Sequence, residues 1–270
     1  MTLDAARIRD TLADHPFYVR AVVADSLTST NDEARRLAAQ GAGEGTVVLA
    51  NAQSAGRGRH GRHWVSAPGL GLYVSVVLRP GEPVERVTRW TLAASVAACE
   101  ACRAAGRPVS IEWPNDLVHG RRKLAGILAE VRSTDRVPSD LVIGVGINVH
   151  HRAADLPPPI AERATSLHLI GGGGILERER LAVDYLERLA GIVSELRAGG
   201  WPRVAARWEE LAPGSRGCRG RVLPGRRDEA GTEFVGVTRG LDPEGALVVE
   251  DETGRARVVR TVESFVPLEA

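Results

Sequence analysis

The sequence lacks any marked excess of charge. It contains 35 Lys plus Arg against 34 Asp plus Glu in 270 residues, a formal net charge of +1. General binders of nucleic acid usually carry a large basic excess, so this class is disfavoured, although a local basic site remains possible. Long apolar runs are lacking as well. No stretch approaches the roughly 20 residues that a helix needs to cross a bilayer, and we predict no membrane partner.

Export signals and a disulfide framework are missing too. Residues 1–14 lack the basic start and apolar run of a signal peptide. Three cysteines do not form a disulfide framework. Cys99 and Cys102 lie in an Ala-rich helical pattern, and we interpret them as small core residues rather than as redox or metal groups. We therefore expect a cytoplasmic protein.

Lysine is almost absent, because Lys123 is the only one and every other basic residue except histidine is Arg. A composition of this kind uses Arg wherever charge alone matters. A single Lys in that background either survives by chance or marks a site where a guanidinium does not serve.

Hydrophobic periodicity and turn residues predict a mixed α and β chain up to about residue 212. After Pro213-Gly214 the composition changes to short β-rich segments separated by turns, which predict a small β-barrel. We also expect loops over 156–159 and 171–174. Beyond a lead-in helix and strand within 1–28, the predicted helices are 32–40, 86–105, 178–197 and 202–211, and the predicted strands are 46–50, 71–78, 109–113, 117–119, 123–132, 141–149, 220–223, 233–239, 246–250 and 256–261.

A Gly/Arg loop at 55–64 is the richest segment. Its glycines allow close backbone approach, its Arg side chains offer bidentate donors for anions, and Trp64 offers a ring for stacking. The loop does not match the Walker pattern. Three interpretations compete: a disordered segment that contacts RNA, a solvated basic loop without a task, and a clamp for a nucleotide and a carboxylate.

Three further clusters follow along the chain. Asn115 and Asp116 stand at a turn after Trp113-Pro114, where they either cap the turn or hold Mg²⁺ or phosphate. The sole lysine opens the apolar segment 123–128, in which Gly126 permits a ligand to approach the backbone. The segment 144–149 is a strand interrupted by glycines, which weaken a strand unless something packs closely there.

Taken in order, these motifs resemble the biotin–protein ligase family. The ordered set is Ser29-Thr30-Asn31, Gln53 with Gly56 to Trp64, Trp113 to Leu117, Lys123 to Leu128 and Gly146 to Val149. The resemblance implies an α+β fold: a mixed β-sheet flanked by helices, of the class II tRNA synthetase type, with a small C-terminal SH3-like β-barrel. We expect a catalytic domain over 1–212 and the SH3-like domain over 213–270.

The resemblance also implies an activity. Members of this family use ATP to activate biotin as biotinyl-5′-AMP and then transfer it to a lysine of a biotin carboxyl carrier domain of an acyl-CoA carboxylase. Because a carboxylate and a triphosphate repel each other, the site needs cations, which the arginines of the loop, Lys123 and Mg²⁺ supply. The carrier lysine must lose a proton before it attacks, and Asp116 is our candidate base or orienting group.

The family pattern places individual residues by function. The expected catalytic residues are Arg57, Arg59, Lys123 and Asp116. The expected biotin-binding residues are Ser29, Thr30, Asn31, Gln53, Gly56, Arg57, Gly58, Arg59, Lys123 and Gly126. The expected ATP-binding residues are Arg59, His60, Arg62, Trp64, Asn115 and Asn148, and Asn115 and Asp116 are the candidate metal ligands.

Two positions depart from the family pattern. Glu112 stands where the family usually has a Lys, and His60 where an Arg is common. A carboxylate ~6 Å from a phosphate costs about 3 kcal/mol at an effective dielectric of about 20. Three explanations stay open: Glu112 points away and pairs with Arg121 or Arg122, the chain is a variant with reduced activity, or it binds biotin without turnover.

Other functions compete with this one. A lipoate–protein ligase activates a carboxylate in the same way on a related fold, and an RNA- or phosphate-binding module would use the Gly/Arg loop alone, with binding that weakens steeply in salt. Some family members carry an N-terminal winged helix that binds DNA. The lead-in has no space for one, so we expect no DNA partner. We expect a monomer or a weak homodimer.

Overall fold

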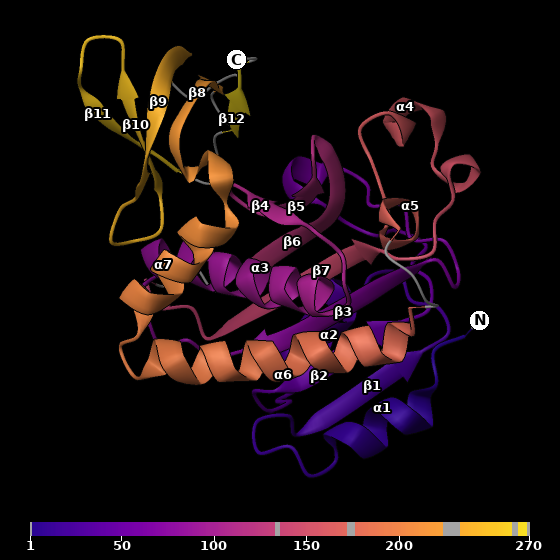
Figure 1. The fold of residues 1–270 in the computed structure, drawn as a ribbon. Coiled ribbons are helices and arrows are strands. Elements are labelled where there is room, and N and C mark those ends of the chain that lie inside the picture. Colours follow the sequence, from indigo (N-terminus) through magenta and orange to yellow (C-terminus); the bar gives the residue numbers. More distant parts are fainter. Residues whose placement is uncertain (1, 133–135, 172–175, 224–232, 261–263, 269–270) are drawn as a thin grey trace.

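The computed structural model describes residues 2–132, 136–171, 176–223, 233–260 and 264–268. A seven-stranded sheet with the order β1-β2-β3-β7-β6-β5-β4 forms its centre (Figure 1). Strands β1 and β2 run parallel, and the other neighbours are antiparallel. The strands are β1 Arg20–Ala24, β2 Thr46–Ala50, β3 Gly71–Leu78, β4 Ser110–Glu112, β5 Asp116–His119, β6 Arg122–Arg132 and β7 Asp140–Asn148.

Helices cover the two faces of this sheet unequally. The long helices α3 and α6 pack on one face, with α7 against α3, and the shorter α2 packs on the other face over β2, β3 and β7. In Figure 1, α3 and α6 cross in front of the sheet. The helices are α1 Ala5–Leu12, α2 Thr30–Ala39, α3 Val87–Ala104, α4 Pro158–Ala161, α5 Leu167–Ile170, α6 Arg178–Arg197 and α7 Trp201–Leu211, with 3₁₀ turns at Arg59–Gly61, Val84–Arg86, Ala153–Asp155 and Pro213–Ser215. No helix of the described chain is long and apolar enough to cross a membrane.

Strand β7 shows why the two faces differ. Alternate residues of a strand point to opposite faces. On the α3 side, β7 presents the buried aliphatic residues Leu141, Ile143, Val145 and Ile147 to the main core cluster. On the α2 side, it presents Val142 to a small second cluster and then glycines. One face is therefore filled by side chains, and the other leaves room above its backbone.

Helix α2 begins where the polar caps predicted it. The side chain of Ser29 accepts a hydrogen bond from the backbone N–H of Asp32, at 3.5 Å, which satisfies a donor of the first turn. Ala34, Leu37 and Ala38 are buried against the sheet. The helix begins at Thr30, two residues before the predicted start, so Thr30 and Asn31 belong to its first turn.

A second sheet follows α7, with the strand order β11-β10-β9-β8-β12. Its residues Leu247 and Val249 belong to the main core cluster, and the Nε of Arg89 in α3 donates a hydrogen bond to the carbonyl oxygen of Pro243 at 2.9 Å. The second sheet is therefore fixed to α3, beside β4 and β5 (Figure 1). Its strands are β8 Arg216–Leu223, β9 Phe234–Leu241, β10 Leu247–Asp251, β11 Ala256–Val259 and β12 Ser264–Pro267.

The predicted fold class is confirmed: a mixed sheet flanked by helices precedes a separate antiparallel sheet. Cys99 and Cys102 are buried in α3, as predicted. The expected loop at 156–159 is wrong in its second half, because Pro158 opens the one-turn helix α4. Proline is tolerated in the first turn of a helix, where its missing N–H has no partner to lose.

Two short elements were not predicted. Helix α5 is one turn long and is capped by Ser166, whose hydroxyl accepts from the N–H of Leu169 at 3.1 Å. Strand β12 pairs with β8 at the edge of the second sheet, where Pro267 is tolerated. Four residues carry too little periodicity to identify either element. Residues 172–174 of the loop expected at 171–174, and Thr261 at the end of the last predicted strand, lie outside the described residues.

Candidate functional site

Three glycines form the floor of the site on the α2 face of the sheet. Gly126 of β6 pairs with Gly146 of β7, and Gly144 lies two residues before Gly146, on the same face. A Cβ atom at Gly146 would lie 2.6 Å from Nε1 of Trp64, and one at Gly144 would lie 2.0 Å from Oδ1 of Asn31. These glycines are needed because Trp64 and Asn31 lie directly on the backbone.

The Gly/Arg loop returns over this floor and is held by backbone hydrogen bonds. The N–H of Trp64 donates to the carbonyl oxygen of Gly56 at 2.9 Å, and that of Gly58 donates to Arg62 at 2.7 Å. A Cβ atom at Gly56 would lie 2.5 Å from the carbonyl oxygen of Trp64. His60, at the tip, has a φ of 56° and is exposed. The loop is therefore an ordered hairpin over the sheet, which disfavours the disordered interpretation.

A chain of polar side chains joins the base of the loop to α2. Gln53 Oε1 accepts hydrogen bonds from the N–H of Thr30 at 2.7 Å and from its hydroxyl at 3.1 Å. The buried Ser75 hydroxyl is 2.8 Å from Thr30 Oγ1 and 2.6 Å from Asn31 Oδ1. Predicted biotin-binding residues from two segments thus share one network, and Ser75 is a member that the sequence interpretation missed.

Arg57 is held by two carboxylates. Its Nη2 lies 2.7 Å from Oδ1 of Asp32 and 2.7 Å from Oε2 of Glu130. The same Glu130 oxygen accepts from Nδ2 of Asn31 at 2.8 Å. Arg57 is thus tied to α2 and β6 through its Nη2. Glu130 was missed, although a Glu within an otherwise apolar strand was a visible signal.

Arg59 reaches across to the second cluster. Its Nη1 donates to Oδ1 of Asn115 at 3.0 Å, and Asn115 Nδ2 donates to the carbonyl oxygen of Ile127 at 2.8 Å. Burial lowers the pKa of Arg59, Asp116 opposes this shift, and Arg62 adds to it. The guanidinium remains charged in any case. A partly buried cation is thereby fixed beside Asn115, while Arg62 is exposed.

Lys123 lies at the start of β6, above the glycine floor. Its Nζ is 2.6 Å from Oδ1 of Asp116 and 5.6 Å from the centroid of the Trp64 ring. A Cβ atom at Gly126 would lie 3.4 Å from Nζ of Lys123 and 3.3 Å from the Trp64 ring. The ammonium, the indole and the glycine are therefore neighbours, as the order of the motifs suggested.

Several donors of the loop have no acceptor. Nε of Arg57, Nη2 of Arg59 and Nε1 of Trp64 are buried and have no hydrogen-bond partner in the part of the chain that the structure describes. A buried donor without a partner costs free energy, so these atoms indicate a ligand that is rich in acceptor oxygens. A carboxylate or a phosphate supplies such oxygens.

Asn148 lies apart from this network. It shares the strand face of Gly146 by alternation, but its Nδ2 donates to the carbonyl oxygen of Thr165 at 3.0 Å. Ser29 acts as the cap of α2. Among the predicted residues, the structure thus brings together those of α2, the loop, the Asn115-Asp116 turn and β6, and it leaves Asn148, His60 and Arg62 at the margin.

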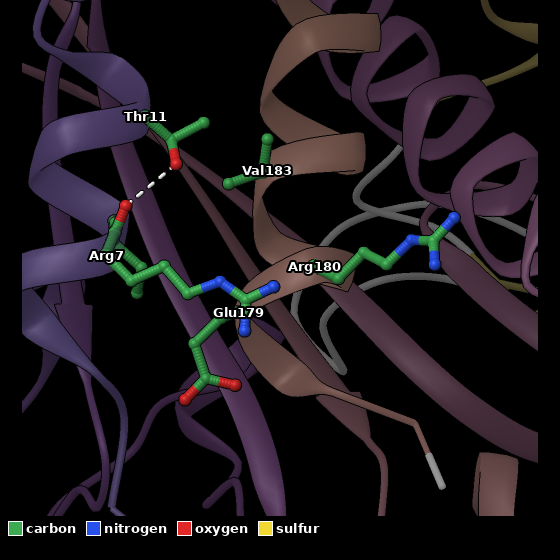
Figure 2. A pocket seen from close by; sticks show the side chains of 6 residues that line it. Arg7, Thr11, Glu179, Arg180 and Val183 are labelled. Carbon is green, nitrogen blue, oxygen red and sulfur yellow. Dashed lines mark hydrogen bonds between the residues drawn. The ribbon is translucent and has the colours of Figure 1, made fainter. Parts of the chain in front are cut away.

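Two hollows in the surface lie elsewhere. One of about 330 Å³ lies between α1 and α6 and is lined by Arg7, Thr11 and Glu179, among others (Figure 2). A second of about 490 Å³ lies beside it, at the end of α3. Charges of both signs line them, and none of the predicted site residues does. We place the site on the glycine floor instead, because the loop that lies over it carries three buried donors without acceptors in the described chain.

Comparison with known proteins identifies relatives of this chain. Residues 23–148 match the biotin/lipoate A/B protein ligase family. The chain is 35% identical over 238 residues to the biotin–[acetyl-CoA-carboxylase] ligase of Mycobacterium tuberculosis, covering 86% of this chain and 83% of that protein. It is 34% identical over 241 residues to the bifunctional ligase/repressor BirA of Bacillus subtilis, covering 87% and 70%.

A solved structure is similar over nearly the whole chain. The biotin protein ligase from Aquifex aeolicus in complex with biotin and ATP superposes with a TM-score of 0.78 at 26% identity, covering 93% of this chain and 100% of that one. The sequence matches and the structural match agree with the resemblance derived from the motifs. The chain therefore belongs to the biotin/lipoate A/B protein ligase family and groups with its biotin protein ligases.

Proposed function

We propose that this protein is an ATP-dependent ligase that forms biotinyl-5′-AMP and transfers biotin to a lysine of a carboxyl carrier domain. The relative from Mycobacterium tuberculosis is named as a ligase of acetyl-CoA carboxylase, and the similar structure from Aquifex aeolicus holds biotin and ATP. These names indicate the two small substrates and the kind of protein acceptor.

Three buried donors of the loop, which have no acceptor among the residues that the structure describes, are the observation that carries the proposal. They are Nε of Arg57, Nη2 of Arg59 and Nε1 of Trp64. Attack of the biotin carboxylate on the α-phosphate of ATP brings two anions together, and fixed donors stabilise the charge that develops there. Arg59 and Lys123 supply two positive charges beside the glycine floor.

Arg57 has a narrower function in this scheme than the family pattern implied. Because Asp32 and Glu130 occupy its Nη2, we assign its Nε, which is buried and has no acceptor within the described ranges, to the ligand. We assign the polar chain at the base of the loop to the ring end of biotin. That chain comprises Thr30, Asn31, Gln53 and Ser75. Ser29, which caps α2, and Gly56 and Gly58 of the loop stay with it in the proposal.

The nucleotide would lie towards Arg59 and Asn115. Trp64 covers Gly126 and Gly146, so its indole shields the reacting atoms from water, as expected for a loop that closes over a reactive anhydride. His60, Arg62 and Asn148 stand at the margin and remain candidates for contact with the distal phosphates or the adenosine.

The proposed magnesium ligands do not form a metal site by themselves. Asn115 Oδ1 already accepts from Arg59, and Asp116 Oδ1 is paired with Lys123. No group of three or more His, Cys, Asp or Glu residues able to hold a metal occurs in the described ranges. We therefore propose that any Mg²⁺ enters with the phosphates of ATP, which commonly hold this ion.

In the second step the carrier lysine attacks the biotinyl carbonyl and AMP leaves. Asp116 orients Lys123, which we place beside the oxygen that leaves with AMP.

We keep the division into a catalytic domain at 1–212 and a C-terminal domain at 213–270 as part of the proposal. It is supported by the change of sheet between α7 and β8. The cytoplasmic location, the monomer or weak homodimer and the lack of a DNA partner also remain predictions.

Pyrophosphate release with ATP, Mg²⁺ and biotin, with and without an apo carboxyl carrier domain, tests the function. We expect release that depends on biotin, and labelling of the carrier. Arg59→Met should abolish most of the release, whereas Arg255→Met, at an exposed position in the second sheet, should not. Tight biotin binding without release would indicate a binding protein, and release with lipoate in place of biotin would indicate a lipoate ligase.

A further inference from the structure

Glu112 lies on the same sheet face as the glycine floor. Residues that pair directly across neighbouring strands share one face. Glu112 pairs with Asp116, Asp116 pairs with Gly126, and Gly126 pairs with Gly146. This row runs from beneath Trp64 to β4, the edge strand of the sheet. Glu112 therefore marks the open end of the site and does not point away from it.

Three charged groups surround Glu112: Asp116 on β5, Lys123 on β6 and Arg121 in the turn between these strands. The neutral thiol of Cys218 on β8 of the second sheet is also near, because burial and then the charge of Glu112 raise the pKa of Cys218. Burial raises the pKa of Glu112, Asp116 raises it further, and Lys123 and Arg121 oppose these shifts. The side chain still has substantial solvent access. The carboxyl of Glu112 thus lies among charged groups at a solvent-accessible edge, between the two sheets.

Among the described residues, no hydrogen bond or ion pair to the Glu112 carboxyl is found. Lys123 and Arg121 act on it through their charge alone, rather than through the pairing that its sequence position suggested. Asp116, in contrast, holds Nζ of Lys123 at 2.6 Å. Of the two carboxylates in the row, only Glu112 is thus available to an incoming group. An available carboxylate beside a site for anions repels both small substrates, but it attracts an ammonium group.

We propose that Glu112 receives the ε-ammonium of the acceptor lysine and takes its proton in the transfer step. This inference rests on the proposed ligase function and names a residue for its second half-reaction. The carboxylate of Glu112 accepts one proton from the ammonium. The amine nitrogen then bonds to the biotinyl carbonyl carbon, the bond from that carbon to the phosphate oxygen breaks, AMP leaves with the electron pair, and the nitrogen releases its second proton to solvent.

Separate measurement of the two half-reactions tests the proposal. Adenylate formation is followed by biotin-dependent exchange of pyrophosphate into ATP. Transfer is followed in a single turnover from the preformed enzyme–biotinyl-AMP complex to an apo carboxyl carrier domain. We expect Glu112→Gln to slow transfer about a hundredfold. Its loss in the exchange reaction should be at least tenfold smaller than its loss in transfer. Glu112→Asp should recover part of the transfer rate. Glu85→Gln, which removes an exposed carboxylate outside the site, is the matched control.

Two further readouts separate proton transfer from a structural effect. The wild-type transfer rate should fall at acid pH as Glu112 is protonated, and Glu112→Gln should lose that dependence. Hydroxylamine is already neutral near pH 7.5 and needs no base, so it should consume the adenylate equally fast in wild type and Glu112→Gln. An equal loss in exchange and transfer, or an unchanged transfer rate, would overturn the proposal. Absence of biotin-dependent exchange in the wild type would instead overturn the ligase function itself.

Discussion

The two faces of strand β7 differ in the side chains that they carry, although they share one backbone. The face towards α3 and α6 carries aliphatic residues that are fully buried, such as Ile143 and Ile147. The face towards α2 carries Gly144 and Gly146, over which Asn31 and Trp64 lie. One face gains stability from side-chain packing, and the other gives up side chains so that a loop and its ligand can reach the backbone.

This contrast predicts a separation of stability from activity along a single strand. Substitutions on the aliphatic face should lower the free energy of unfolding and leave the chemistry of the folded fraction intact. Substitutions on the glycine face should do the reverse.

The largest effect is expected on the aliphatic face. Ile147 is 0% exposed, and replacing such a residue with Ala leaves a cavity that costs about 2–5 kcal/mol. We expect Ile147→Ala to lower the free energy of unfolding by that amount in urea titrations. Its rate of adenylate formation per folded molecule should stay within about twofold of wild type. A large loss of rate in fully folded protein would contradict the separation of the two faces.

Lys123 should show the opposite behaviour. Removing one group that stabilises developing charge costs about 10²–10³ in rate, and we expect a loss of this size in adenylate formation for Lys123→Met. The side chain is half-exposed, so its single ion pair with Asp116 adds little to stability. Lys123→Arg should remain impaired, because a planar guanidinium does not replace a compact ammonium. Full activity of Lys123→Arg would show that charge alone matters there.

Gly146→Ala tests the glycine face directly, next to Ile147 in the sequence. The new methyl group would lie 2.6 Å from Nε1 of Trp64, so the indole must move. A displacement of about 1 Å in a positioned group can cost about a hundredfold in rate. We expect a loss of this order in adenylate formation with little change in the urea midpoint. Gly191→Ala, where a Cβ meets nothing within 4 Å, serves as the control.

Most of the fold was predictable because its strong signals are local. The predicted strands 46–50 and 71–78 match β2 and β3 to the residue, since both are runs rich in β-branched residues that follow a glycine turn. The helix at 178–197 matches α6 equally well. Strand β12 and helix α5 were missed, because pairing with β8 and capping by Ser166 fix them rather than their own composition.

The sequence motifs predicted which residues belong to the site, but not which of them contact one another. The motif order identified Arg57, Arg59 and Lys123. It gave no sign that Glu130 and Asp32 would hold Arg57, because Glu130 lies 73 residues away along the chain. The orientation of Glu112 followed from strand register, which the sequence did not supply. Long-range pairing and register are tertiary properties, so they escape a linear pattern.

The smallest effect is expected at Glu130, which ties the Gly/Arg loop to the glycine face of the sheet. Glu130 Oε2 accepts from both Arg57 Nη2 at 2.7 Å and Asn31 Nδ2 at 2.8 Å, and Asp32 offers Arg57 a second carboxylate. Because hydrogen bonds to charged groups contribute about 1.5–3 kcal/mol and solvent screens these half-exposed groups, we expect Glu130→Gln to raise the KM for biotin about tenfold and to leave kcat nearly unchanged. Faster hydrogen exchange at residues 56–64 should accompany the change.

The control is Glu100→Gln, which removes a carboxylate partner of Arg188 and Arg207 on the helical side. It should alter neither the KM for biotin nor the hydrogen exchange of the loop. If Glu130→Gln changed kcat but left hydrogen exchange in the loop unaltered, Glu130 would act on the chemistry rather than on the loop. The contrast between a face that packs side chains and a face that anchors the Gly/Arg loop would then be wrong.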